Sequence, residues 1–310
     1  MSSAPRRAET ILRRLEWTVI RRLDGLLQGD YRTLFRGFGV DLADLREYQF
    51  HDDVRHIDWN VTARMQVPYV REFNEDREIT AWFLLDVSPS VDFGSLDTNK
   101  RSVLAEFVAV LSRLFTRHGN RVGVIAFDGK VDLVIPPGSG RRHVLHILTS
   151  LIEKSDSPPG PTTDLGELLK AAQGILRRRA LVFLVSDFIS APGWSDRLGI
   201  LSQRHELLAV RLFDPLEMDL PELGMMVMRD AETGENLFVD TTDRGFRARF
   251  AALALEREEE LRGSLRRAGV DTLELSTEDD LVETLLRFAD LRTHRSRASV
   301  RLPDHLGGRP

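Results

Sequence analysis

Three oxygen-bearing side chains follow a buried apolar run at alternate positions. The stretch that begins at Phe83 reads FLLDVSPSVDFG, so Asp86 ends the run and Ser88 and Ser90 come next. Alternate residues of an extended segment point to the same side, and we therefore expect these side chains to face one ligand. A carboxylate at the buried end of a strand costs free energy unless it is paired or bound to a metal ion. The spacing predicts a cation site, although either serine could instead cap a short turn.

Two further segments offer ligands of the same kind. Asp187 follows the apolar run LVFLV, and the loop GPTTDLGELL places Thr163 and Asp164 at the start of a helix. Thr162 is the alternative to Thr163 as a ligand. Thr163 or Asp164 could also serve only as the N-cap of the helix, a position that both residue types favour.

The predicted ligand set is Asp86, Ser88, Ser90, Thr163 and Asp187. Hard cations such as Mg²⁺ take oxygen ligands in near-octahedral geometry and usually keep some water. We predict a site for Mg²⁺ or Mn²⁺ with few anionic ligands, so that a carboxylate from outside can complete it. We also expect the serine hydroxyls to lie exposed in a loop, so that their removal leaves the fold intact.

A second cluster of possible metal ligands lies earlier in the chain, in the stretch HDDVRHID. Its members are His51, Asp52, Asp53, His56 and Asp58. A zinc site usually needs further ligands from another segment, and none is obvious. We therefore favour a network of charges that fastens this segment to the rest of the protein.

The strongest enzymatic alternative is a Mg²⁺-dependent phosphatase of the haloacid dehalogenase type, with Asp86 as nucleophile. Such an enzyme needs a second aspartate two residues later, where this chain has Ser88. It also needs a lysine, and none of the lysines stands in a strand-end motif: Lys100, Lys130, Lys154 and Lys170. We therefore predict that the protein is not an enzyme.

The elements that must position these residues alternate along the chain. Apolar runs predict strands at 81–85, 122–127, 181–185, 207–213 and 272–275, and helical periods lie between them, for example at 100–119, 165–179 and 244–269. Such alternation predicts an α/β fold with a doubly wound, mostly parallel sheet covered by helices on both faces. An Asp-Gly turn in VIAFDGKVDLVI predicts one local hairpin. Polar residues that follow parallel strands meet at one edge of the sheet, where such folds bind ligands.

Four parts of the chain are predicted. Residues 1–29 form an amphipathic helix, for which we favour docking on its own domain over a membrane surface. Residues 30–78 form a small β segment with many charges, in which PYVREF is an edge strand. Residues 79–290 form the α/β domain, and 291–310 form a basic, flexible tail.

The composition excludes several classes of protein. The chain has 310 residues, a formal net charge of −5 and no cysteine, so thiol catalysis, zinc–thiolate sites and disulfides are excluded. The small net charge gives no reason to expect binding to nucleic acid. No apolar run is long enough to span a bilayer, and we expect a cytoplasmic protein.

The motifs also match a known family. DVSPS, a loop threonine and the later SD resemble the metal-ion-dependent adhesion site of von Willebrand factor A domains. The block REYQFHDDVRHIDWNVTAR shortly before it resembles the bacterial domain of unknown function fifty-eight family. The likeness extends from about Leu12 to Arg292. Phe50 and His51 stand where the family often has a Pro-Gly turn, and the two membrane spans of many relatives are missing.

The resemblance implies a von Willebrand factor A-like fold and a specific division of roles. The serines and Thr163 would contact Mg²⁺ directly, and Asp86 and Asp187 would do so mainly through water. A partner's Asp or Glu would complete the shell. A MoxR-type AAA+ ATPase is the partner that the resemblance implies, which suggests an adaptor or co-chaperone.

Overall fold

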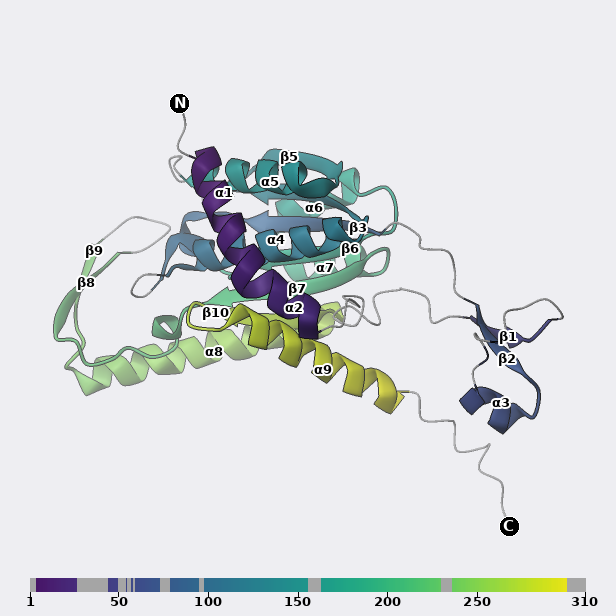
Figure 1. Ribbon diagram of the computed structural model, residues 1–310. Coiled ribbons are helices and arrows are strands. Elements are labelled where there is room, and N and C mark those ends of the chain that lie inside the picture. The colour runs from purple at the N-terminus through teal and green to yellow at the C-terminus, as the bar shows by residue number, and fades with distance from the viewer. Residues whose placement is uncertain are drawn as a thin grey trace, which may run out of the picture.

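The chain folds around a six-stranded sheet (Figure 1). The structure is a computed structural model that describes residues 4–26, 44–49, 54, 57, 59–72, 79–94, 98–155, 163–229 and 236–299. The strands of the sheet, in spatial order, are β10 (Asp271–Ser276), β7 (Glu206–Phe213), β6 (Leu181–Ser186), β3 (Thr80–Asp86), β4 (Arg121–Phe127) and β5 (Val131–Gly138).

Neighbouring strands are parallel except β4 and β5, which form the antiparallel hairpin predicted at the Asp-Gly turn. Numbered along the chain, the order is 3-2-1-4-5-6, that of a doubly wound α/β fold. The direction of winding reverses between β3 and β6. The carboxyl ends of these two strands therefore form the crevice in which such folds bind ligands. The predicted fold class is confirmed.

β3 lies in the interior because its residues are apolar on both faces. Trp82 and Leu84 face one side, Phe83 and Leu85 face the other, and all four are buried. A strand with two buried faces shows a continuous apolar run instead of an alternating one. The carboxylate that ends this run is consequently placed inside the protein.

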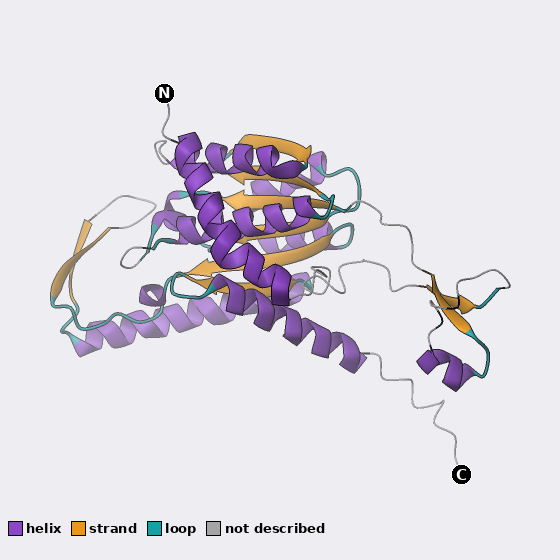
Figure 2. Cartoon of the chain, viewed as in Figure 1, coloured by secondary structure: helices purple, strands orange, loops and turns teal. Residues whose placement is uncertain are grey.

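Helices cover both faces of the sheet (Figure 2). The face that includes Phe83 packs against the N-terminal helix, α4 (Lys100–Arg117), α5 (Gly140–Ser155) and α9 (Leu281–Ser299). The face that includes Trp82 packs against α6 (Leu165–Ile175), α7 (Trp194–Ser202) and the C-terminal part of α8 (Arg244–Ala268).

The N-terminal helix is docked on the sheet domain, as predicted. It consists of α1 (Ala4–Leu15), one π-helical stretch η1 (Glu16–Ile20) and α2 (Arg21–Leu26). Leu12, Leu15 and Leu23 of its apolar stripe are buried in the same core as α4 and α5. The apolar stripe therefore packs against the sheet domain and is not free to contact a membrane surface.

The small segment before the sheet domain is described in part. β1 (Asp44–Glu47) pairs antiparallel with β2 (Tyr69–Glu72), which confirms the strand predicted at PYVREF. The short helix α3 (Trp59–Met65) was not predicted, because two turns are too few to show a clear period. The charges predicted to lock this segment in place fall mostly outside the described side chains: Arg46, Asp52, Asp53, Arg55 and Asp58. Its docking on the sheet domain stays a prediction.

Two features of the C-terminal half differ from the prediction. β8 (Met225–Arg229) and β9 (Asn236–Asp240) form a hairpin that no Asn-Gly or Asp-Gly turn announces. α9 continues to Ser299, beyond residue 291 where the tail was predicted to begin, through Arg, Leu and Ala, which favour helices. Residues 300–310 lie outside the described part. None of the helices described is both long and apolar enough to cross a membrane.

Candidate metal centre

Asp86 lies fully buried at the carboxyl end of β3. Its Oδ1 accepts a hydrogen bond from the backbone N–H of Ser88 at 3.1 Å. Its Oδ2 accepts one from the hydroxyl of Ser186, the last residue of β6, at 2.6 Å. The side chain thus connects the two strands between which the winding reverses.

Ser88 and Ser90 converge, as their spacing predicts. Their Oγ atoms lie 3.1 Å apart. Pro89 opens the 3₁₀ turn η4 (Pro89–Asp92), which suits its fixed φ, and this turn brings the second hydroxyl back beside the first. The expectation that these hydroxyls are exposed is wrong, because Ser88 is 0% and Ser90 4% exposed.

Arg101 explains why the serine loop is held in the interior. Its Nη2 donates to the backbone carbonyls of Val87 at 2.8 Å and Ser88 at 3.3 Å. The same guanidinium pairs with Asp92 at the end of the loop. The loop is therefore fastened to the first turn of α4.

Asp187 follows β6 and lies next to Asp86, as predicted from the two strand ends. Its Oδ1 accepts from the backbone N–H of Ile189 at 3.1 Å, and Oδ2 accepts from the Lys100 ammonium at 2.7 Å. The next residue, Phe188, has φ +61°, a strained conformation for a bulky side chain. Strain of this kind persists only where the surroundings fix it, often at functional sites.

The electrostatics of the two aspartates favour a cation. Burial, and then the charge of Asp187, raise the pKa of Asp86 to about 6, although hydrogen bonds from Ser186 and Ser88 lower it. Burial alone would lower the pKa of Lys100, but the nearby carboxylates of Asp187 and Glu217 outweigh it and raise that pKa above its usual value. The lysine is therefore an ammonium at neutral pH.

Thr163 lies beside the loop that carries Asp187. Its backbone carbonyl accepts from the N–H of Ala191 at 3.2 Å and from the hydroxyl of Ser190 at 3.3 Å. The threonine is buried, and Thr162 lies outside the described residues. Asp164 is the N-cap of α6 and accepts from the N–H of Gly166 at 2.8 Å, so the capping alternative holds for that residue.

Three residues of this region were not among the predicted ligands. Ser186 bonds Asp86; it belongs to the SD pair quoted from the sequence, of which only Asp187 was a predicted ligand. Lys100 and Glu217 form an ion pair at 2.6 Å that no local pattern signals. Lys100 stands at the start of α4 and not in a strand-end motif, but its ammonium contacts Asp187, so the lack of such a motif no longer argues against a phosphatase. The other argument, Ser88 in place of an acid, is unaffected.

The chemistry of the residues present fits a divalent cation. Among the described residues no three of His, Asp, Glu or Cys gather as a metal-binding group. The donors here are hydroxyls and two carboxylates, which are the oxygen ligands that Mg²⁺ and Mn²⁺ prefer. The Lys100 ammonium pairs with Asp187 and Glu217, and Asp86 adds a second buried carboxylate beside Asp187.

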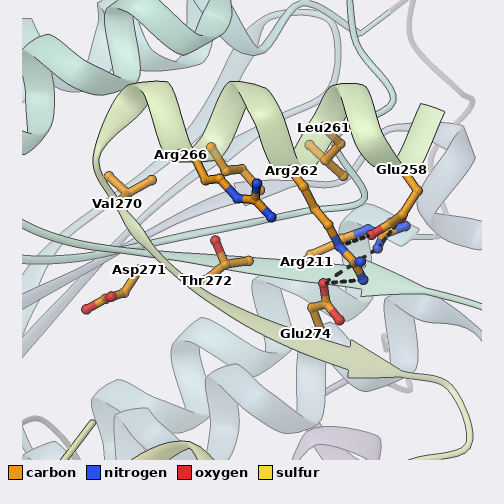
Figure 3. A pocket seen from close by; sticks show the side chains of 10 residues that line it. Arg211, Glu258, Leu261, Arg262, Arg266, Val270, Asp271, Thr272 and Glu274 are labelled. Carbon is orange, nitrogen blue, oxygen red and sulfur yellow. Dashed lines mark ion pairs between the residues drawn. The ribbon is translucent and has the colours of Figure 1, made fainter. Parts of the chain in front are cut away.

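A cavity of about 310 Å³ lies elsewhere, over edge strand β10 and α8 (Figure 3). The guanidinium of Arg211 lies 2.6 Å from the Glu258 carboxylate, and that of Arg262 lies 2.8 Å from it. Glu274 lies within 3.9 Å of Arg211 and 3.5 Å of Arg262. These charges balance one another, so the network fastens α8 to the sheet and offers little to a charged ligand.

The earlier cluster from His51 to Asp58 has most of its residues outside the described part, and the zinc alternative is not tested.

Solved structures with a related fold include the conserved hypothetical protein BatB from Bacteroides thetaiotaomicron. It has a TM-score of 0.43 and 14% identity over 71% of this chain and 99% of that chain. The SpRpn10 VWA domain has a TM-score of 0.37 and 12% identity over 68% of this chain and 94% of that domain. At such low scores the fold class rests on the strand order and connections described above.

Curated relatives at higher identity come from mycobacteria. Uncharacterized protein Rv1480 of Mycobacterium tuberculosis is 34% identical over 281 residues, which cover 91% of this chain and 88% of the relative. Uncharacterized protein MAV169 of Mycobacterium avium is 32% identical over 158 residues, 51% of this chain and 93% of the relative. The family model described as "Protein of unknown function DUF58" matches residues 44–260. The chain therefore belongs to the DUF58 family.

Proposed function

We propose that the protein is a non-catalytic, Mg²⁺-dependent protein-binding module that acts in the cytoplasm. Its metal centre would consist of Asp86, Ser88, Ser90, Thr163 and Asp187. The observation that carries the proposal is the meeting of two buried carboxylates and two facing serine hydroxyls in the ligand-binding crevice. When bound, the metal would supply an electrophilic position that accepts a carboxylate from another protein.

The chain's own residues keep these donors in place. The hydrogen bonds from Ser88 and Ser186 to Asp86 orient both of its carboxylate oxygens. Arg101 holds the backbone of the serine loop, and Asp187 is held through its own loop by Ile189. The donors are therefore arranged before any ligand arrives, which lowers the cost of binding.

A groove next to the serine loop gives a partner segment room to lie. It has a volume of about 320 Å³ and runs between α1, α4 and α5. Its lining includes the apolar residues Ile11, Leu104 and Leu151. Among its charged residues, Arg101 pairs with Asp92 and Arg14 pairs with Glu106, and Arg7 adds a further positive charge. This mixture suits an acidic segment with apolar residues near the carboxylate that it presents.

The resemblance to the DUF58 family indicates the class of protein that would be the partner. We propose that a MoxR-type AAA+ ATPase presents an Asp or Glu to the metal centre and that this protein serves it as an adaptor or co-chaperone. The nucleotide state of the ATPase could then decide whether the acidic residue is available.

A binding experiment with matched variants tests this function. The purified protein is immobilised, and the MoxR-type ATPase of the same organism is applied with Mg²⁺ or with a chelator. We expect binding only with Mg²⁺, and none by the Asp86→Asn variant. Asp128→Asn is the control, because Asp128 follows the neighbouring strand β4 and pairs with Lys154 at 3.5 Å. Binding that survives both the chelator and Asp86→Asn would contradict the proposal.

The phosphatase alternative is tested on the same proteins. We expect no phosphomonoester hydrolysis above that of the metal-free sample, because Ser88 replaces the acid that the reaction needs. Mg²⁺-dependent turnover that Asp86→Asn abolishes and Asp128→Asn retains would support the enzyme instead.

A further inference from the structure

Lys100 is a buried cation at the metal centre that the proposed function does not use. It is the first residue of α4, and its side chain is 0% exposed. The positive end of the helix dipole lies at this end of the helix, so a lysine here opposes the local electrostatic preference. A buried ammonium also costs free energy unless it is paired. Its placement therefore depends on the groups that it contacts.

Two carboxylates from different loops compensate for this cost. The ammonium Nζ lies 2.7 Å from Oδ2 of Asp187 and 2.6 Å from Oε1 of Glu217. Glu217 belongs to η5 (Pro215–Glu217), the turn that follows β7. Its other oxygen accepts from the N–H of Asp214 at 3.0 Å, so its position is fixed independently of the lysine. Lys100 thus bridges Asp187, a predicted metal ligand, and the carboxylate of Glu217, which is not a predicted ligand.

The ammonium already neutralises a charge that a metal ion would otherwise meet. Asp187 has one oxygen engaged by the N–H of Ile189 and the other by Lys100. A divalent cation beside Asp187 would feel the repulsion of a positive charge only a few Å away, in an interior where charges are poorly screened.

We propose that Lys100 is the internal counter-ion of the metal centre: it holds Asp187 in place without metal and weakens the affinity for divalent cations. The inference rests on the proposed metal site. It explains how acidic side chains on adjacent strand ends stay packed in the absence of a bound ion. It also makes Lys100 a positioning residue that sets the metal concentration at which the site fills.

Replacement of Lys100 by methionine tests the inference, since methionine has a similar length and no charge. The dissociation constant for Mn²⁺ is measured by isothermal titration calorimetry on the full chain. We expect Lys100→Met to bind Mn²⁺ at least about tenfold more tightly than the wild type, because a nearby repulsive charge is gone. In metal-free buffer its melting temperature should fall, and Mn²⁺ should restore it. Lys154→Met is the matched control, because Lys154 also pairs with two acids, Asp128 and Asp132, outside the predicted ligand set.

A second variant changes the affinity in the opposite direction and serves if Lys100→Met does not fold. Glu217→Gln removes a negative charge and keeps the shape, so Mn²⁺ should bind about tenfold more weakly. A purely structural role of the triad would weaken metal binding in both variants.

The outcomes separate this inference from the proposed function. Wild-type binding that is equal to or tighter than that of Lys100→Met would overturn the inference and leave the metal site standing. Mn²⁺ binding that appears only in Lys100→Met would support the inference and contradict a metal-dependent function of the natural protein. No binding by either protein, both being folded, would overturn both proposals.

Discussion

Asp86→Asn should stabilise the metal-free protein at neutral pH, although it removes a predicted metal ligand. Burial and the charge of Asp187 raise the pKa of Asp86 to about 6, from 3.8 for a free carboxyl. The folded protein therefore holds this proton more tightly than the unfolded chain. Between these two pKa values, stability falls as the pH rises.

The magnitude follows from the difference between the two pKa values. About two pKa units correspond to about 3 kcal/mol of unfolding free energy, absent below pH 3.8 and fully expressed above pH 6. Near pH 5 about half of it should be expressed. Asparagine carries no charge and accepts the same bond from Ser88, but it disturbs the bond from Ser186, which costs about 1 kcal/mol. We expect a net gain of about 2 kcal/mol at pH 7.

Urea denaturation in metal-free buffer at pH 4.5, 5.5 and 7.5 measures this effect. Groups remote from the site titrate alike in both proteins, so the difference between Asp86→Asn and the wild type reports on this carboxyl and its interaction with Asp187. The difference should grow with pH in favour of the variant and should shrink when Mg²⁺ is added. A difference that does not change with pH would mean that the buried charge of Asp86 has no cost in free energy, contrary to this prediction.

Three further predictions concern the surroundings of the site. The double substitution Ser88→Ala with Ser90→Ala removes a buried hydroxyl pair, so urea denaturation should show a loss of about 1–2 kcal/mol in the free energy of unfolding. Calorimetry should show no Mg²⁺ binding by this variant. Retained Mg²⁺ binding would exclude both serines as ligands. Asp164→Ala removes the N-cap of α6 and should cost about 1 kcal/mol in the same assay, with metal binding unchanged, whereas loss of metal binding would make this residue a ligand. Arg211→Met removes one partner of the buried Glu258 carboxylate and should lower the free energy of unfolding by about 3 kcal/mol. The loss should not be larger, because Arg262 still pairs with Glu258. An unchanged melting temperature would contradict a structural role of this network.

The sheet was predictable from sequence because its strands are continuous apolar runs. β3 and β6 are buried on both faces, and so is β4 from Val122 to Phe127. The short elements were less predictable. α3 has only two turns, and no Asn-Gly or Asp-Gly pair stands between β8 and β9 in the sequence.

The serine loop was predictable because alternate spacing after a buried strand leaves few arrangements. Asp86, Ser88 and Ser90 lie where that spacing places them, although the loop is buried and not exposed. The ion pairs of Lys100 were not predictable. They join residues 87 and 117 positions apart along the chain, and they depend on how α4 packs over the crevice. Local sequence patterns carry no record of such packing.

Diffraction from crystals soaked in Mn²⁺ would locate a metal ion in the crevice directly, because its anomalous signal identifies the position of the ion. We expect one strong peak at bonding distance from the hydroxyls of Ser88 and Ser90, with Asp86, Thr163 and Asp187 around it. A peak only at another cluster, such as His51 to Asp58, or no peak in the crevice at millimolar Mn²⁺, would contradict this prediction.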